Sequence, residues 1–339
     1  MSNRSFSPLR LTLFVFVVFF AFTATACGKK DASGTPANET TTANDGESVS
    51  TKETDSSADY ELMQAAGERL SSKFGKLSTP SAPGTVTQGN DVVTIDTSNS
   101  GEGYFYTNYT GNNPKVKLQL TGPDNVTYTY NINNGETCLP ITAGDGSYTI
   151  AVYENISDDQ YSTAYSGNFT VTLTNTFGPY LYPNQYVNYT SKSNAVMLAN
   201  DFAVNASSDL ETVCEVYHYI TDNIVYDKEE AKTVTYDYLP DVDEVLQTKK
   251  GICFDYAALM AAMLRSQGIP TRLHVGYAGD AYHAWINVYI EDIGWIDGII
   301  QFDGKDWSLM DPTFAANKNS KNTQDFIGDG NNYNTLYTY

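Results

Sequence analysis

Between about residues 91 and 174, apolar and polar residues alternate along the chain. Apolar side chains take every second position in four runs, at 116–120, 128–132, 148–152 and 169–173. Gly-Pro-Asp-Asn, Asn-Asn-Gly and Gly-Asp-Gly turns lie between them. Short strands of period two separated by turns are typical of a β-sandwich. We expect such a domain over residues 88–178, its tyrosines filling the core; an exposed aromatic stripe for a glycan or protein partner is the alternative.

After residue 180 the pattern becomes helical. Leu210, Val213, Tyr217 and Ile220 fall on one helix face, with Asp209 as a candidate N-cap. A second, short helix is expected to begin at Asp241 and to end at Lys249 to Gly251. We place Gly251 at the turn because glycine tolerates a left-handed backbone.

A third helix is expected from Cys253, rich in alanine and ended by the Gly-Ile-Pro sequence at 268–270. Residues 271–277 and 282–290 then alternate like strands. In the second strand, His283 and Trp285 face one way, and Ala284 and Ile286 face the other. The sequence therefore predicts an α+β chain, in which a β-sandwich is followed by a domain at 180–339 whose cysteine-bearing helix packs on an antiparallel sheet.

The N-terminus has the pattern of an export signal. A basic start is followed by an apolar run at 11–22, too short to span a bilayer as a helix, and then by Ala-Thr-Ala before Cys27. The small residues suit ordinary signal cleavage, but a cysteine at the junction resembles a bacterial lipobox. We expect residues 1–27 to be a lipoprotein signal peptide with Cys27 as the lipidation site. Residues 28–85 are then a disordered polar tether with one short helix near 60–74.

Charge and cysteine content narrow the function. With 20 Lys+Arg against 40 Asp+Glu, the formal net charge is −20, which argues against nucleic acid as a partner. Only Cys138 and Cys214 are available for a disulfide; the alternative is two inert buried thiols. Three histidines and no Cys-x-x-Cys or His-x-x-x-His spacing argue against zinc, so we expect neither metal nor cofactor.

A thiol, an imidazole and a carboxylate follow one another in the second domain. Cys253 begins a helix, where the positive end of the helix dipole favours a thiolate. His283 lies in a Tyr-His-Ala-Trp sequence at the start of a strand, and Asp311 in Met-Asp-Pro-Thr. A strand at 307–310 beside the histidine strand would bring the carboxylate to the imidazole. This is the set of groups that nucleophilic acyl transfer uses.

The combined Gly-x-Cys, His-Ala-Trp and Asp-Pro-Thr sequences, over residues 213–314, resemble the transglutaminase-like (papain-fold) superfamily. The resemblance implies that Cys253 is the nucleophile, His283 the general base and acid, and Asp311 the residue that orients the imidazole. The backbone N–H of Cys253 would hold part of the oxyanion, and Tyr226 and Tyr236 are candidates for the second donor. The segment 298–305 is longer than is usual before the aspartate.

Three functions fit these observations. The first is a cysteine peptidase or amidase that acts on protein or cell-envelope amides from the outer face of the cell membrane, held there by its lipid anchor. The second is a transglutaminase that crosslinks glutamine side chains to amines through the same acyl-enzyme. The third is a non-catalytic envelope scaffold or binding protein, since such domains can lose their triad.

Overall fold

The computed structural model describes residues 77–339 except 133–134, 236, 279–280, 292, 297–299, 303–306 and 310–332. These residues all belong to one compact unit. The predicted signal peptide, Cys27, the tether and the helix near 60–74 lie outside the described residues, as do Tyr236 and Asp311. In the part of the chain that is described, no helix is long and apolar enough to cross a membrane.

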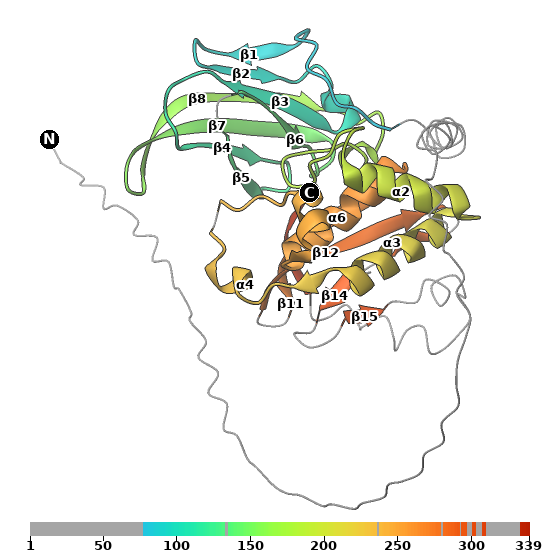
Figure 1. Cartoon of the computed structure of the whole chain (residues 1–339). Helices are drawn as coiled ribbons and strands as arrows, with labels where there is room; N and C mark the ends of the chain where they lie inside the picture. The colour runs from blue at the N-terminus through green and yellow to red at the C-terminus, as the bar shows by residue number, and fades with distance from the viewer. Residues whose placement is uncertain are drawn as a thin grey trace, which may run out of the picture. The chain divides into compact units, whose positions relative to one another are not determined.

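The first half of the structure is built from two antiparallel four-stranded sheets (Figure 1). One has the order β1-β2-β3-β6, with strands at Thr87–Gly89, Val93–Asp96, Tyr104–Tyr109 and Gly135–Pro140. The other has the order β5-β4-β7-β8, with strands at Thr127–Asn131, Val116–Thr121, Gly146–Ser157 and Gln160–Val171.

The alternating side chains fill the space between these sheets. Leu118, Tyr130 and Ile150 are each at most 1% exposed. Phe105 on β3 contacts Phe169 on β8, with 5.7 Å between ring centroids. The period-two pattern thus gives each sheet one apolar face, and the two faces bury one another. Several of the tyrosines predicted to fill a core do so here.

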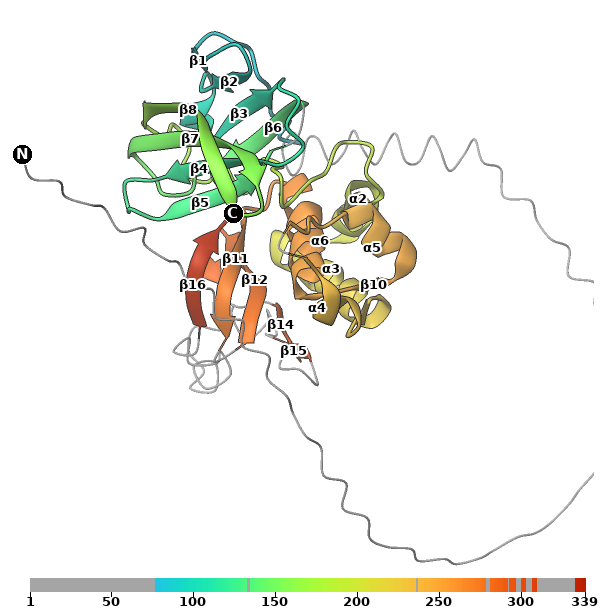
Figure 2. The same ribbon diagram turned by 90° about the vertical axis from the view of Figure 1, so that its left-hand side faces the viewer.

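The second half consists of helices packed on an antiparallel sheet. The helices are α2 (Asn194–Asn205), α3 (Asp209–Asn223), α4 (Glu230–Thr233), α5 (Val242–Thr248) and α6 (Cys253–Ser266). The sheet has the order β13-β12-β11-β16, with strands at Gly294–Ile296, Ala281–Ile290, Thr271–Ala278 and Tyr333–Thr338. Figure 2 shows the helices on one side of β16, β11 and β12.

Helix α6 is buried almost all round, which explains its small and apolar composition. Its residues from Asp255 to Ser266 are all buried. One side packs against β11 and β12, and the others against α2, α3 and α5. Alanines at 257, 258, 261 and 262 have no exposed surface and allow these close approaches. The helix that begins with Cys253 is therefore held from several directions.

Arg265 on α6 hydrogen-bonds Tyr339 within the core. Its side chain is 1% exposed and donates hydrogen bonds to the carbonyl oxygens of Thr271, Tyr182 and Tyr339, at 2.9, 3.0 and 2.8 Å. Tyr339 also exchanges backbone hydrogen bonds with Leu273, and its ring packs against a tyrosine of β5 in the sandwich, at 5.6 Å. The strand β16, which the sequence did not predict, thus joins both halves.

The predicted α+β fold class, with a sandwich before a helix-on-sheet half, is confirmed; the domain boundaries remain a prediction. The predicted role of Gly251 is wrong. The left-handed residue after α5 is Lys249, with φ 56°. Gly251 is required for another reason: a Cβ there would lie 2.7 Å from the Cβ of Asp255.

Three smaller expectations also change. The N-cap of α3 is Ser208, whose side chain accepts from the N–H of Glu211, and Asp209 is the first helical residue. Helix α2 was not predicted. Cys138 and Cys214 are not joined by a disulfide, and burial raises the pKa of Cys138 to about 12, as expected of a buried thiol.

Candidate active site

Cys253 is the first residue of α6, and a pair of short parallel strands fixes its approach. β9 (Val225–Tyr226) pairs with β10 (Lys250–Gly251), and Gly251 lies opposite Tyr226. The carbonyl of Gly251 accepts the N–H of Asp227 at 2.9 Å, which extends the pairing by one residue. Because this pairing fixes the backbone two residues before Cys253, the thiol and Tyr226 come from neighbouring strands.

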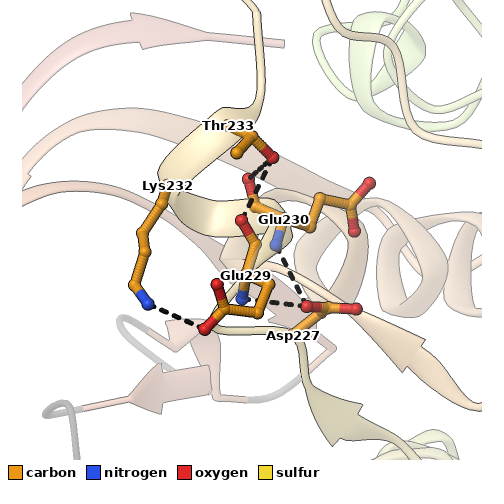
Figure 3. Close-up of polar contacts among 5 residues, drawn as sticks. All are labelled: Asp227, Glu229, Glu230, Lys232 and Thr233. Carbon is orange, nitrogen blue, oxygen red and sulfur yellow. Dashed lines mark hydrogen bonds and ion pairs between the residues drawn. The ribbon is translucent and has the colours of Figure 1, made fainter.

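The turn after Tyr226 is closed by its own side chains (Figure 3). A carboxylate oxygen of Asp227 accepts the backbone N–H groups of Glu229 and Glu230, each at 3.0 Å. Lys232 pairs with Glu229 at 2.7 Å, but both side chains are largely exposed, so this pair adds little stability. The Asp227 turn therefore anchors the chain that carries Tyr226.

Asp255 caps the helix that carries Cys253. Its side chain has no exposed surface; it accepts the backbone N–H of Ile252 at 2.7 Å and the hydroxyl of Tyr238 at 2.6 Å. Burial is the largest cause that raises the pKa of Asp255, to about 6, and the two hydrogen bonds oppose it. This carboxyl satisfies a helix-start donor that would otherwise be buried without a partner.

Backbone N–H groups surround the sulfur of Cys253. It accepts hydrogen bonds from Ala284 on β12 and from Phe254 on its own helix. β13 pairs with β12 only at residues 288–290, so within the described part of the chain the edge of β12 near Ala284 has no strand partner on that side. The thiol accepts the N–H of Ala284, which a neighbouring strand would otherwise accept.

Burial nonetheless raises the pKa of Cys253, and the N–H donors oppose this shift without reversing it. The sequence predicted a thiol more acidic than a free cysteine. The helix dipole on which that prediction rested is present, but α6 lies within the packed core, where a thiolate loses most of its contact with water. At Cys253 burial therefore outweighs the helix dipole and the pKa rises, whereas the dipole lowers the pKa of a cysteine at an exposed helix N-terminus.

Tyr226 contacts Cys253 at two points. Its hydroxyl accepts the backbone N–H of Cys253 and also hydrogen-bonds the thiol, and its pKa is raised to about 12, mainly by burial. The ring of Tyr256 packs against it at 6.4 Å, and the Tyr256 hydroxyl donates to the carbonyl of Ile224 at 2.6 Å. Of the two tyrosines named from the sequence, Tyr226 thus lies at the N–H predicted to hold an oxyanion.

His283 lies near the start of β12, directly before the residue that donates to the thiol. It is 8% exposed, and burial lowers its pKa to about 4. Its ring stacks over Trp285 with 6.4 Å between centroids, and Trp285 stacks over His274 on β11 at 5.6 Å. This confirms that His283 and Trp285 share one face of the strand.

His274 has the environment of a structural histidine. One ring nitrogen pairs with the hydroxyl of Thr338 at 2.9 Å, and burial lowers its pKa to about 4, with Arg272 as a second cause. His218 lies exposed on α3. The N–H donors of the Cys253 thiol come instead from Phe254 and Ala284.

The segment that leads to Asp311 differs from expectation. Residues Ile300–Phe302 (β14) and Trp307–Leu309 (β15) pair with each other as a two-stranded antiparallel sheet. The prediction that residues 307–310 form a strand of the histidine sheet is therefore wrong: the described residues 307–309 pair with β14 in a separate sheet. Asp311 lies outside the described residues, so its role stays a prediction.

Residues 196–298 match the sequence model of the transglutaminase-like superfamily. The chain contains a transglutaminase-like domain. Its match begins within α2 and covers Cys253, His283 and the strands between them.

Curated relatives align over part of the chain only. Mouse (Mus musculus) kyphoscoliosis peptidase is 30% identical over 139 residues, which are 38% of this chain and 19% of that protein. The uncharacterized protein YebA of Bacillus subtilis is 30% identical over 99 residues, 24% of this chain and 12% of that protein. The chain thus spans less than a fifth of the length of these relatives.

Solved structures give weaker likenesses. A candidate cysteine protease from Cytophaga hutchinsonii is 14% identical, with a TM-score of 0.34, and the match covers 70% of this chain and 83% of that one. Red sea bream transglutaminase is 16% identical, with a TM-score of 0.23, over 62% and 48% of the two chains. Values this low add no argument about the site.

In the transglutaminase-like domain the thiol of Cys253 accepts the backbone N–H of Ala284, the residue after His283. Tyr226 contacts Cys253, and the roles of Cys253, His283 and Asp311 stay predictions. Asp255 and Tyr238 were not predicted; the only signal for Asp255 was its place three residues after the helix N-cap, where a carboxylate can bond the cap's N–H. No cluster of three metal-ligating side chains occurs among the described residues.

Proposed function

We propose that this protein is a cysteine acyl-transfer enzyme, most specifically a peptidase or amidase acting on peptide or isopeptide amides. The observation that supports this best is the position of Cys253: it begins a buried helix, its sulfur accepts N–H donors, and one of these donors is adjacent to His283. A merely structural cysteine has no need of such an arrangement.

In the proposed reaction His283 removes the proton of the Cys253 thiol as sulfur attacks the amide carbon. Since burial disfavours charge on both groups, thiol and imidazole are neutral before substrate binds, and the proton moves during attack. The imidazolium then protonates the leaving amine, and water resolves the thioester. Asp311 would orient the imidazole.

The oxyanion would be bound at the N–H of Cys253. The hydroxyl of Tyr226 now accepts that N–H, so an incoming carbonyl oxygen competes with Tyr226 for it. Once displaced, the same hydroxyl would be free to donate to the oxyanion. Tyr226 is therefore our second oxyanion donor.

The reaction is tested with the purified protein, a labelled primary amine and a mixture of protein substrates. Hydrolysis predicts new peptide ends without amine incorporation, whereas crosslinking predicts incorporation. Cys253→Ser, which is close to cysteine in volume, should abolish either product and retain the fold. Equal product with this variant would overturn the proposal.

We also propose that the protein acts outside the cytoplasm, anchored to the membrane through lipid on Cys27. The basic start, the apolar run at 11–22 and the small residues before Cys27 support this. Wild type should carry a labelled fatty acid and partition into detergent, and Cys27→Ala should do neither. Wild type that partitions into the aqueous phase without lipid would refute the anchor.

A further inference from the structure

Two tyrosines are exposed at the end of the histidine sheet that lies nearest to the candidate nucleophile. Tyr282 on β12 is 60% exposed and Tyr277 on β11 is 41% exposed. They lie directly opposite one another in the sheet, and their rings meet edge to face with 5.5 Å between centroids. Large apolar side chains that gather on a surface often mark a binding site, so the position of this pair is informative.

Both rings lie on the face of the sheet that α6 covers. Side chains two residues apart in a strand share a face, so Tyr282 shares the face of Ala284, and Tyr277 shares that of Val275. Ala284 and Val275 belong to the buried apolar cluster that contains the alanines of α6. The two tyrosines are therefore exposed because they lie beyond the end of the helix, on the same side of the sheet.

The direction of α6 places its N-terminus next to this pair. At the start of the helix, the sulfur of Cys253 accepts the N–H of Ala284. At its other end, Arg265 donates to the carbonyl of Thr271, which pairs with the far part of β12. The helix thus runs along β12 away from the start of the strand, and Tyr282 comes before the helix begins. Because a strand rises about 3.3 Å per residue, the Cα of Tyr282 lies roughly 7 Å from that of Ala284.

A substrate amide held at the sulfur of Cys253 has these rings within reach of its neighbouring side chain. Successive residues of an extended peptide are separated by roughly 3.3 Å along the chain, so a side chain next to the amide spans the distance from Ala284 to Tyr282. Aromatic rings offer apolar area, and they pack well with a further ring or with an aliphatic chain. The pair is therefore placed to select the residue that adjoins the reacting amide.

The surroundings of the rings favour an uncharged side chain. On its other side Tyr277 pairs with Asn334 of β16, which is exposed and carries no charge. In the described part of these strands no carboxylate adjoins either ring, so a cationic side chain would have only the rings to bind it. An apolar side chain needs no charged partner and gains from contact with both rings.

We propose that Tyr282 and Tyr277 form a specificity subsite, which packs against a large apolar side chain next to the amide that Cys253 attacks. This inference rests on the proposed acyl transfer and narrows its substrate to peptides with an apolar residue at the reacting amide. Contact between the two rings also stabilises the hairpin that carries them. The test therefore measures the selection of one reagent over another, which a purely structural pair would not change.

The experiment compares the rates at which paired reagents alkylate Cys253 in the full chain, measured by mass spectrometry. The chloromethyl ketones of N-acetyl-phenylalanine and N-acetyl-glycine differ by one aromatic side chain on the acyl side of the reacting carbon. N-phenylethyl-iodoacetamide and N-methyl-iodoacetamide differ in the same way on the amine side. In at least one pair the aromatic reagent should react about tenfold faster, as expected when part of an aromatic side chain is buried.

Variants of Tyr282 assign this preference to the ring. Tyr282→Ser should reduce the preference to about twofold or less, and Tyr282→Phe should retain it, because the ring makes the contact. Neither change should alter the rate with unsubstituted iodoacetamide. Ile156→Ser is the matched control: Ile156 on β7 of the sandwich is 65% exposed, and its loss removes apolar surface far along the chain from the pair. It should keep the wild-type preference.

The outcomes separate the subsite from the reaction. Equal rates within both reagent pairs, or a preference that Tyr282→Ser leaves intact, would overturn the subsite, while rapid labelling by iodoacetamide would still support the nucleophile. A faster reaction of the lysyl than of the phenylalanyl chloromethyl ketone would assign the rings to a cation and also overturn the proposal. Slow labelling of Cys253 by every reagent would instead refute the acyl transfer on which the subsite depends.

Discussion

Acid should destabilise this protein through two buried histidines. The pKa of His274 and that of His283 are each lowered from 6.5 to about 4, so the unfolded chain binds protons that the folded protein does not. The stability that each contributes is present above pH 6.5 and is lost as the pH falls toward 4. Between pH 7 and pH 5, these values give a loss of about 2 kcal/mol for each histidine.

Asp255 acts in the opposite direction. Its pKa is raised from 3.8 to about 6, so its contribution to stability is fully present below pH 3.8 and is lost as the pH rises through 6. Lowering the pH from 7 to 5 therefore returns about 1 kcal/mol. The three groups together predict a net loss of about 2 to 3 kcal/mol, a substantial part of the stability of a typical domain.

The assay is urea unfolding at pH 7 and pH 5, followed by tryptophan fluorescence, which reports the transglutaminase-like half because all three tryptophans lie after residue 284. His274→Gln should reduce the loss between the two pH values by about 2 kcal/mol. His218→Gln, at an exposed position on α3, is the control and should behave as wild type. A loss as large in His274→Gln as in wild type would refute the reasoning.

The remaining predictions each rest on a single contact or group. Arg265→Met should lower the free energy of unfolding by about 3–5 kcal/mol, because it removes a buried cation that bonds three carbonyls. The control is Arg272→Met, which loses only the stacking of Arg272 over Trp295 at 3.7 Å and should cost about 1 kcal/mol in the same urea titration. Tyr226→Phe should lower the acyl-transfer rate about 10- to 100-fold, measured as kcat on any substrate found, while KM changes little; an unchanged kcat would remove Tyr226 from the oxyanion site. The rate of Cys253 alkylation should still be rising at pH 9, because burial raises the pKa of this thiol; a plateau below pH 8 would show a thiolate already formed at neutral pH.

Patterns along the chain predicted much of the fold. Alternation at 116–120 and 148–152 predicted β4 and β7, because a strand with one buried face must alternate. The helical spacing from Leu210 to Ile220 predicted α3 in the same way. By contrast, β16 pairs with β11 across about sixty residues of sequence, and no local pattern predicts which strand it pairs with.

Residue types and spacing selected Cys253 and His283 as candidates for the site, since few other functions need those groups in that order, and their roles stay predictions. The sequence did not reveal the packing around them, and so it predicted the wrong direction for the pKa of Cys253. The burial of Cys253 depends on the packing of α2, α3 and α5 against α6. These helices are distant in sequence, so the residues near Cys253 do not predict it.

The central claim, that Cys253 is a nucleophile assisted by His283, is tested most directly by iodoacetamide labelling at neutral pH with mass-spectrometric rates for each cysteine. Cys253 should react faster than Cys138, whose pKa is raised to about 12, and faster than Cys214. His283→Ala should slow labelling of Cys253 alone, because it removes the base that takes the thiol proton. Equal, slow labelling of all three cysteines, unchanged by His283→Ala, would contradict the account.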